Sequence, residues 1–138
     1  MNKSDAQFSS TTLVVSNLEM MANFYKEACG LTEVARMSAQ LEGQEISEIL
    51  FNFRGDGPAS FVLLKYMDAE APAPGSSINV FATEDVEAFV SRAVRHGAKL
   101  VDPPVYNSEY GVKYGFIKDP EGHLVGAFEP SESSVGSS

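Results

Sequence analysis

The sequence predicts an α+β fold made of two consecutive β-α-β-β-β modules. The order of strand and helix patterns in the first half recurs in the second half. Residues suited to begin a helix stand at Asn17 and Asp85, which are 85 − 17 = 68 positions apart. Glycines suited to end a helix stand at Gly30 and Gly97, which are 97 − 30 = 67 positions apart. We therefore interpret the chain as a structural repeat with a period of about 68 residues.

The first module begins with the β-branched, apolar segment 11–16, which predicts a strand. Asn17 then predicts a helix start, with the acidic Glu19 in the first turn where the helix dipole favours an anion. The apolar residues of this helix repeat at helical spacing: Leu18, Met21, Tyr25 and Ala28. Three strands are predicted at 31–37, 45–53 and 60–66, the last two joined by the turn-forming segment 54–58.

The second module follows a connector rich in Pro, Ala and Gly at 68–76. A strand is predicted at 78–83, and either Thr83 or Asp85 caps the next helix. Apolar residues of that helix again recur at helical spacing: Val86, Phe89, Val90 and Ala93. Strands are predicted at 99–101, 112–118 and 124–129, with a proline-stiffened loop at 102–110. His96, near the helix end, is explained by the negative pole of the helix dipole.

Composition limits the classes of function. The 138 residues are 43% hydrophobic, which suits a single domain, 1–138, with modules at about 9–67 and 77–130 and a flexible tail at 131–138. The net charge of −9 disfavours nucleic acid and anionic membranes as partners. No apolar run is long enough to span a bilayer, and residues 1–5 lack signal-peptide features, so we expect a cytoplasmic protein. Cys29, the only cysteine, is expected to be a buried apolar group and not a reactive thiol.

The segment 111–130 carries the most specific pattern. An aromatic strand runs into Asp119, Pro120, Glu121 and Gly122, which form a turn, and an aliphatic strand follows. Together with the helix starts at 17–19 and 85–87, this sequence pattern resembles that of the glyoxalase/bleomycin-resistance family, also called the vicinal oxygen chelate superfamily, over residues 9–130. The resemblance implies that the modules form a curled, incomplete mixed β-barrel around a cavity, often completed as a homodimer.

The resemblance also implies where metal-using members hold their ion, on the first and last strands of each module. Counting from the helix starts and from the Asp-Pro turn, those positions hold Ser10, Ile78, Gly126 and either Leu63 or Leu64 in this chain. None of these side chains is an imidazole or a carboxylate, the groups such sites require. We therefore predict no metal at the family's site, and no cofactor.

A largely apolar cavity remains as the predicted binding site. Strand alternation places Ser10, Thr12 and Val14 toward it, with Ile78, Val80, Ala82, Leu124, Gly126 and Phe128 in the second module. Tyrosines from 102–114 are expected to orient a planar ligand, although aromatic residues beside strands are more often core or interface. The predicted ligand-binding residues are Ser10, Thr12, Tyr106, Tyr110, Tyr114, His123 and Phe128. Arg54 and Lys65 are the nearest candidate cations for an anionic group, and both are equally compatible with surface charges.

Three functions fit these observations. The leading hypothesis is a metal-independent protein that binds a small organic molecule. The second is a lyase, isomerase or dioxygenase of the same family that uses displaced metal ligands or an acid/base residue such as His123 or Glu109, with the catalytic residues otherwise unassigned. The third is an accessory interaction module whose cavity is filled by side chains. The sequence does not distinguish among them.

Overall fold

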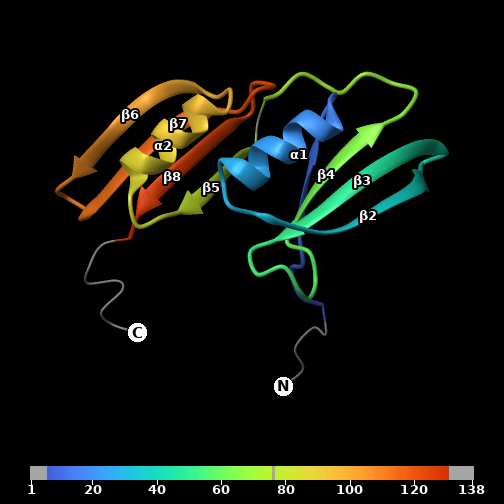
Figure 1. Cartoon of the computed structure of the whole chain (residues 1–138), viewed down its shortest axis with the longest axis horizontal. Coiled ribbons are helices and arrows are strands. Elements are labelled where there is room, and N and C mark those ends of the chain that lie inside the picture. Colours follow the sequence, from blue (N-terminus) through green and yellow to red (C-terminus); the bar gives the residue numbers. More distant parts are fainter. Residues whose placement is uncertain (1–5, 76, 131–138) are drawn as a thin grey trace. The chain divides into compact units, whose positions relative to one another are not determined.

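The computed structural model describes residues 6–75 and 77–130 (Figure 1). The predicted tail at 131–138 and the first five residues lie outside the described residues. The α+β class and the predicted order of elements are confirmed by the described elements, which follow the order β1 (Thr11–Val14), α1 (Leu18–Glu27), β2 (Thr32–Leu41), β3 (Gln44–Asn52), β4 (Phe61–Tyr66), β5 (Ile78–Ala82), α2 (Val86–Arg95), β6 (Lys99–Asn107), β7 (Val112–Lys118) and β8 (Leu124–Glu129).

The chain divides into two compact units, each with one four-stranded mixed sheet. Unit 1 comprises the described residues of Met1–Ala22 and Gly30–Pro72. Unit 2 comprises those of Asn23–Cys29 and Ala73–Ser138. The predicted modules differ from these units in one respect, because the second half of α1 belongs to unit 2.

The sheet of unit 1 has the strand order β1-β4-β3-β2, in which β1 and β4 are parallel and the other pairs are antiparallel. One face carries the buried apolar residues Leu13, Ile49 and Leu63, which lie side by side on neighbouring strands. The Arg36 guanidinium, on the same face, binds the Glu19 carboxylate at 2.6 and 3.1 Å. This contact places the first turn of α1 on that face.

The sheet of unit 2 repeats this topology, with the order β5-β8-β7-β6 and a parallel β5–β8 pair. Its α2 contacts β6, β7 and β8 and buries Val86, Phe89, Val90 and Ala93. The ring of Phe89 lies 5.6 Å from that of Phe81 on β5. The core of this unit therefore lies between α2 and the sheet face that carries Phe81.

The predicted helix ends are confirmed. The Asn17 side chain accepts a hydrogen bond from the backbone N–H of Met20 at 3.0 Å, and Asp85 accepts one from that of Ala88 at 3.0 Å. Gly97 follows α2 with φ +107°, a left-handed conformation that favours glycine. No helix within residues 6–75 and 77–130 is long and apolar enough to cross a membrane.

Two strands extend beyond the predicted bounds. β2 continues to Leu41 and forms a hairpin with β3 through Glu42 and Gly43, whose φ values are +51° and +79°. The prediction of a loop at 102–110 was wrong over its first six residues, because β6 runs from Lys99 to Asn107. Prolines are tolerated there since β6 is an edge strand, and the pairing register shifts on both sides of Asp102.

Candidate functional site

An apolar sheet face in unit 2 is the main candidate site. It lies opposite the Phe81 face that α2 covers, and we call it the open face. Val80 and Val105 are 58% and 53% exposed there, and Ile78 is 52% exposed, although all three are aliphatic. The aromatic residues of the open face are the cross-strand pair Tyr114–Phe128 and the neighbouring Phe116. The open face thus presents the apolar side chains Ile78, Val80, Val105, Tyr114, Phe116 and Phe128, and Asp102, Leu124 and Gly126 lie on the same face.

Phe116 occupies the centre of the open face because its partner on β8 is a glycine. The β7–β8 ladder sets Phe116 opposite Gly126. A Cβ added to Gly126 would lie only 2.9 Å from Cε2 of the Phe116 ring and 3.5 Å from Val80. The ring therefore lies over Gly126 and uses the space that a side chain there would need.

The positions at which the resemblance implies metal ligands are occupied by residues that do not bind metal. On the parallel strands β5 and β8, the facing pairs are Ile78–Leu124 and Val80–Gly126, so apolar side chains and a glycine stand where a histidine and a glutamate are required. In unit 1, Leu63 is fully buried and Leu64 lies opposite Val14. No group of three or more His, Cys, Asp or Glu in the described residues is arranged to hold a metal ion. These residues do not fit an ion at the family's site.

The three predicted tyrosines do not share one face. Tyr114 lies on the open face, with its ring 6.3 Å from that of Phe116 in an edge-on arrangement. Tyr106 pairs with Lys113, the residue that precedes Tyr114 on β7. Because side chains alternate along a strand, Tyr106 belongs to the opposite face. Tyr110 is 70% exposed and lies in the turn between β6 and β7. The expectation that the tyrosines converge on one ligand is therefore not met by Tyr106 and Tyr110.

Ser10 and Thr12 belong to unit 1. Ser10 precedes β1 and is half-buried, whereas Thr12 is exposed and pairs with Val62 on β4. Thr12, Val62 and Leu64 lie on the sheet face opposite Leu13 and Leu63, as strand alternation predicts. On the same face, Glu48 is half-buried and pairs with Leu64 and Met37.

His123 lies in a buried hydrogen-bond network and not on the open face. Its Nδ1 is 2.9 and 3.0 Å from the two carboxylate oxygens of Asp119, and only 7% of His123 is exposed. The Tyr25 hydroxyl donates to the same carboxylate at 2.7 Å. This network joins the second half of α1 to the turn between β7 and β8, so its first role is structural.

Tyr25 is the residue that sequence reasoning missed. Its place in the apolar stripe of α1 predicted burial, and it is fully buried, but the stripe gave no indication of its hydroxyl partner. A buried tyrosine usually has a hydrogen-bond partner for its O–H. The predicted burial of Tyr25 therefore already implied such a partner, without identifying it. Burial, followed by the Asp119 charge and hydrogen bond, raises the pKa of Tyr25 well above 10.0.

Cys29 lies in the same unit and behaves as predicted. It is a free, buried thiol, and only 6% of the residue is exposed. Burial is the main cause that raises its pKa from 9.0 to about 12. The thiolate that nucleophilic chemistry needs is therefore disfavoured at neutral pH.

The raised pKa of Tyr25 predicts a loss of stability in alkali. Below pH 10 the phenol is protonated in both states, but above it the unfolded chain ionises first, so stability falls by up to about 1.4 kcal/mol per pH unit for this group. We expect Tyr25→Phe to reduce the slope of unfolding free energy between about pH 10 and 11, measured by urea unfolding. Tyr106→Phe, at a 61% exposed position, should leave that slope unchanged. Equal slopes for Tyr25→Phe and the wild type would contradict this assignment.

The two repeated units, their matching strand orders and an apolar open face define an α+β protein of the paired β-α-β-β-β class. The model of the Glyoxalase/Bleomycin resistance protein/Dioxygenase superfamily matches residues 7–126, and the chain belongs to that superfamily. The resemblance stated from the sequence is thereby confirmed.

Individual relatives are more distant. The chain is 25% identical over 121 residues to the uncharacterized protein YwbC of Bacillus subtilis, covering 86% of this chain and 94% of that protein. A glyoxalase family protein from Bacillus cereus has a similar structure, with a TM-score of 0.77, 23% identity, and coverage of 94% of this chain and 97% of that one. Glyoxalase I from Zea mays gives a TM-score of 0.68 at 17% identity, over 87% of this chain and 44% of the maize chain. These similarities establish the fold.

Proposed function

We propose that the protein binds a small, planar and largely apolar organic molecule without a metal ion, using the open face of unit 2. The position of the Phe116 ring over Gly126 is the observation that carries this proposal. Where the family's metal-using members need a carboxylate, this chain offers an aromatic surface beside Tyr114. Aromatic rings that are accessible on one side favour stacking with a flat ligand.

The enzyme hypothesis has less support from the geometry. Of its candidate acid/base groups, His123 is buried and bonded to Asp119, and Glu109 lies in the exposed turn after β6. Proton transfer requires the group to come within hydrogen-bond reach of the substrate. A ligand on the open face would instead meet Asp102, which pairs with Phe116, and the Tyr114 hydroxyl. The third hypothesis, an interaction module, predicts no small-molecule ligand at all.

Native mass spectrometry of the purified protein, combined with elemental analysis, tests the proposal. We expect a co-purified organic ligand and no stoichiometric zinc, nickel, manganese or iron, even after these ions are added, because the family positions hold Ile78 and Gly126. One tightly bound ion per chain would overturn the metal-independent proposal and favour the enzyme hypothesis. A protein that binds no compound from a broad screen of planar molecules would favour the interaction module.

Side-chain truncation on the open face should weaken binding of the ligand so identified. Tyr114→Ala or Phe128→Ala is expected to cost about 1 to 3 kcal/mol of binding free energy, measured by calorimetry, if each side chain is an anchor. Tyr106→Ala and Tyr110→Ala are matched controls, because these exposed tyrosines lie off the open face. If the two controls weaken binding and Tyr114→Ala does not, the site lies at the β6–β7 turn instead.

We also propose that the protein acts in the cytoplasm as a homodimer. Each sheet has two edge strands, β1 and β2 in unit 1 and β5 and β6 in unit 2, and unpaired edges favour association. The apolar open face adds surface that a second copy can cover. Sedimentation at low micromolar concentration is expected to give about twice the chain mass of 14.9 kDa. A monomer throughout that range would contradict the dimer.

A further inference from the structure

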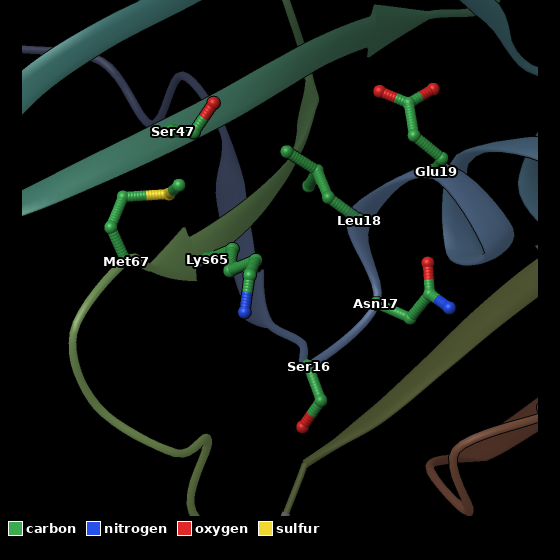
Figure 2. Close-up of a pocket in the computed structure, with 7 residues that line it drawn as sticks. All are labelled: Ser16, Asn17, Leu18, Glu19, Ser47, Lys65 and Met67. Carbon is green, nitrogen blue, oxygen red and sulfur yellow. The ribbon is translucent and has the colours of Figure 1, made fainter.

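Unit 1 contains a pocket of about 480 Å³, a volume in the usual range for small-molecule sites (Figure 2). It lies where the parallel strands β1 and β4 end and α1 begins, and Ser16, Ser47, Lys65 and Met67 are among its lining residues. Lys65 and Ser47 face each other on β4 and β3, one row beyond the buried Leu63–Ile49 pair. Their face is the one that carries Leu13 and Arg36, the partner of Glu19 in the first turn of α1, so this pocket is separate from the face that carries Thr12 and Val62.

Lys65 is the cation of this pocket. In Figure 2 its side chain extends from β4 toward the space between Ser16 and Met67. The residue is half-buried, and its ammonium group makes no ion pair or hydrogen bond with any residue in 6–75 and 77–130. The chain has 19 acidic side chains against 10 basic ones, yet none of the described acids neutralises this ammonium group. A half-buried lysine whose ammonium group has no partner among the described residues favours binding of an anion.

The one carboxylate that lines the pocket, Glu19, pairs with Arg36, a guanidinium that also binds Glu33. Glu19 accepts hydrogen bonds from the Arg36 guanidinium at 2.6 and 3.1 Å, and its side chain points away from Lys65 in Figure 2. Leu18 and Met67 contribute apolar surface to the lining. The pocket therefore combines a positive charge, hydroxyl groups and an apolar wall.

We propose that this pocket is a second ligand site, which binds a small monocarboxylate. The carboxylate pairs with the Lys65 ammonium beside the Ser47 hydroxyl, and a short apolar group lies against Leu18 and Met67. A single lysine balances one negative charge, whereas a phosphate dianion would need further donors. The apolar wall favours an organic acid over an inorganic anion.

Titration of the ¹⁵N-labelled protein with sodium butyrate, followed by NMR, tests this site. We expect saturable shifts of the amide signals of Ser16, Ser47 and Lys65, with a dissociation constant of the order of 1 mM. Sodium chloride at equal ionic strength and butylamine hydrochloride, which carries the opposite charge, should produce no saturable shift there. Lys65→Gln should weaken butyrate binding about tenfold or more, since a charged hydrogen bond is lost.

Two variants separate loss of the charge from loss of the fold. Lys65→Arg keeps a cation and is expected to retain butyrate binding. Lys99→Gln removes an exposed lysine of unit 2 and should bind like the wild type. Shifts that grow linearly without saturating, or unchanged binding in a folded Lys65→Gln, would overturn the site. Tighter binding of inorganic phosphate than of butyrate would overturn the monocarboxylate assignment.

Discussion

Replacing Asp119 with alanine is expected to lower the free energy of unfolding by about 3 kcal/mol or more, because its carboxylate is buried and accepts hydrogen bonds at both oxygens. The Tyr25 hydroxyl donates to it at 2.7 Å and His123 Nδ1 lies 2.9 Å away. Two backbone N–H groups, those of Glu121 and His123, donate to the other oxygen at 3.0 and 2.9 Å. Removing the acceptor leaves several donors without their partner in a buried site, where only 3% of Asp119 is exposed.

Urea unfolding followed by circular dichroism measures this loss. Asp102→Ala is the matched control, since Asp102 is an exposed aspartate on β6 of the same unit. Asp119→Asn keeps the shape and part of the acceptor capacity, so it should fall between Asp119→Ala and the wild type. A loss below about 1 kcal/mol in Asp119→Ala would show that the network contributes little net stability.

The destabilisation expected for Asp119→Ala extends beyond the β7–β8 turn, because this turn contacts both α2 and the second half of α1. Asp119 binds Tyr25 in the second half of α1. Pro120 packs near Gly97, where a Cβ would lie 3.4 Å from the Pro120 ring. The Arg92 side chain of α2 donates to the Ala28 carbonyl at 2.9 Å, which joins the two helices directly. A loosened turn is therefore expected to disturb β8 and with it the open face.

The sequence predicted those features that depend on short stretches of chain. Helix starts at Asn17 and Asp85 follow from side chains that accept a hydrogen bond three residues ahead, and both are present. The last two strands, 112–118 and 124–129, match their predicted bounds because Pro and Gly define the turn between them. The repeat of about 68 residues in the sequence corresponds to two sheets of identical topology.

The remaining features depend on residues that are distant in sequence or on small backbone irregularities. Tyr25 and Asp119 are 94 positions apart, and periodicity alone cannot pair them. The face of Tyr106 was missed because 102–110 was expected to be a loop, so strand alternation was not applied to it; the two register shifts in β6 reverse the presented side twice and cancel at Tyr106. Neither the ring of Phe116 over Gly126 nor the position of Lys65 opposite Ser47 follows from residue type, since both depend on cross-strand pairing.

Gly126→Glu is expected to destabilise the protein by about 2 kcal/mol without creating a metal site. The substitution restores the carboxylate that the family's metal-using members place here, but its Cβ would lie 2.9 Å from the Phe116 ring, which must move. Ile78, at the position of the missing histidine, supplies no second ligand. Thermal and urea unfolding give the stability change, and elemental analysis after incubation with nickel and zinc gives the metal content.

A double-mutant cycle with Phe116→Ala identifies the cause of that loss. If the ring is the obstacle, Gly126→Glu should cost about 1 kcal/mol less in a Phe116→Ala background than in the wild type, because the truncated side chain leaves room for the new one. Additive losses would mean that Gly126 is required for another reason, such as the backbone of β8. Stoichiometric metal in Gly126→Glu alone would show that the ring yields to a carboxylate, and that the aromatic surface is not what keeps the ion out.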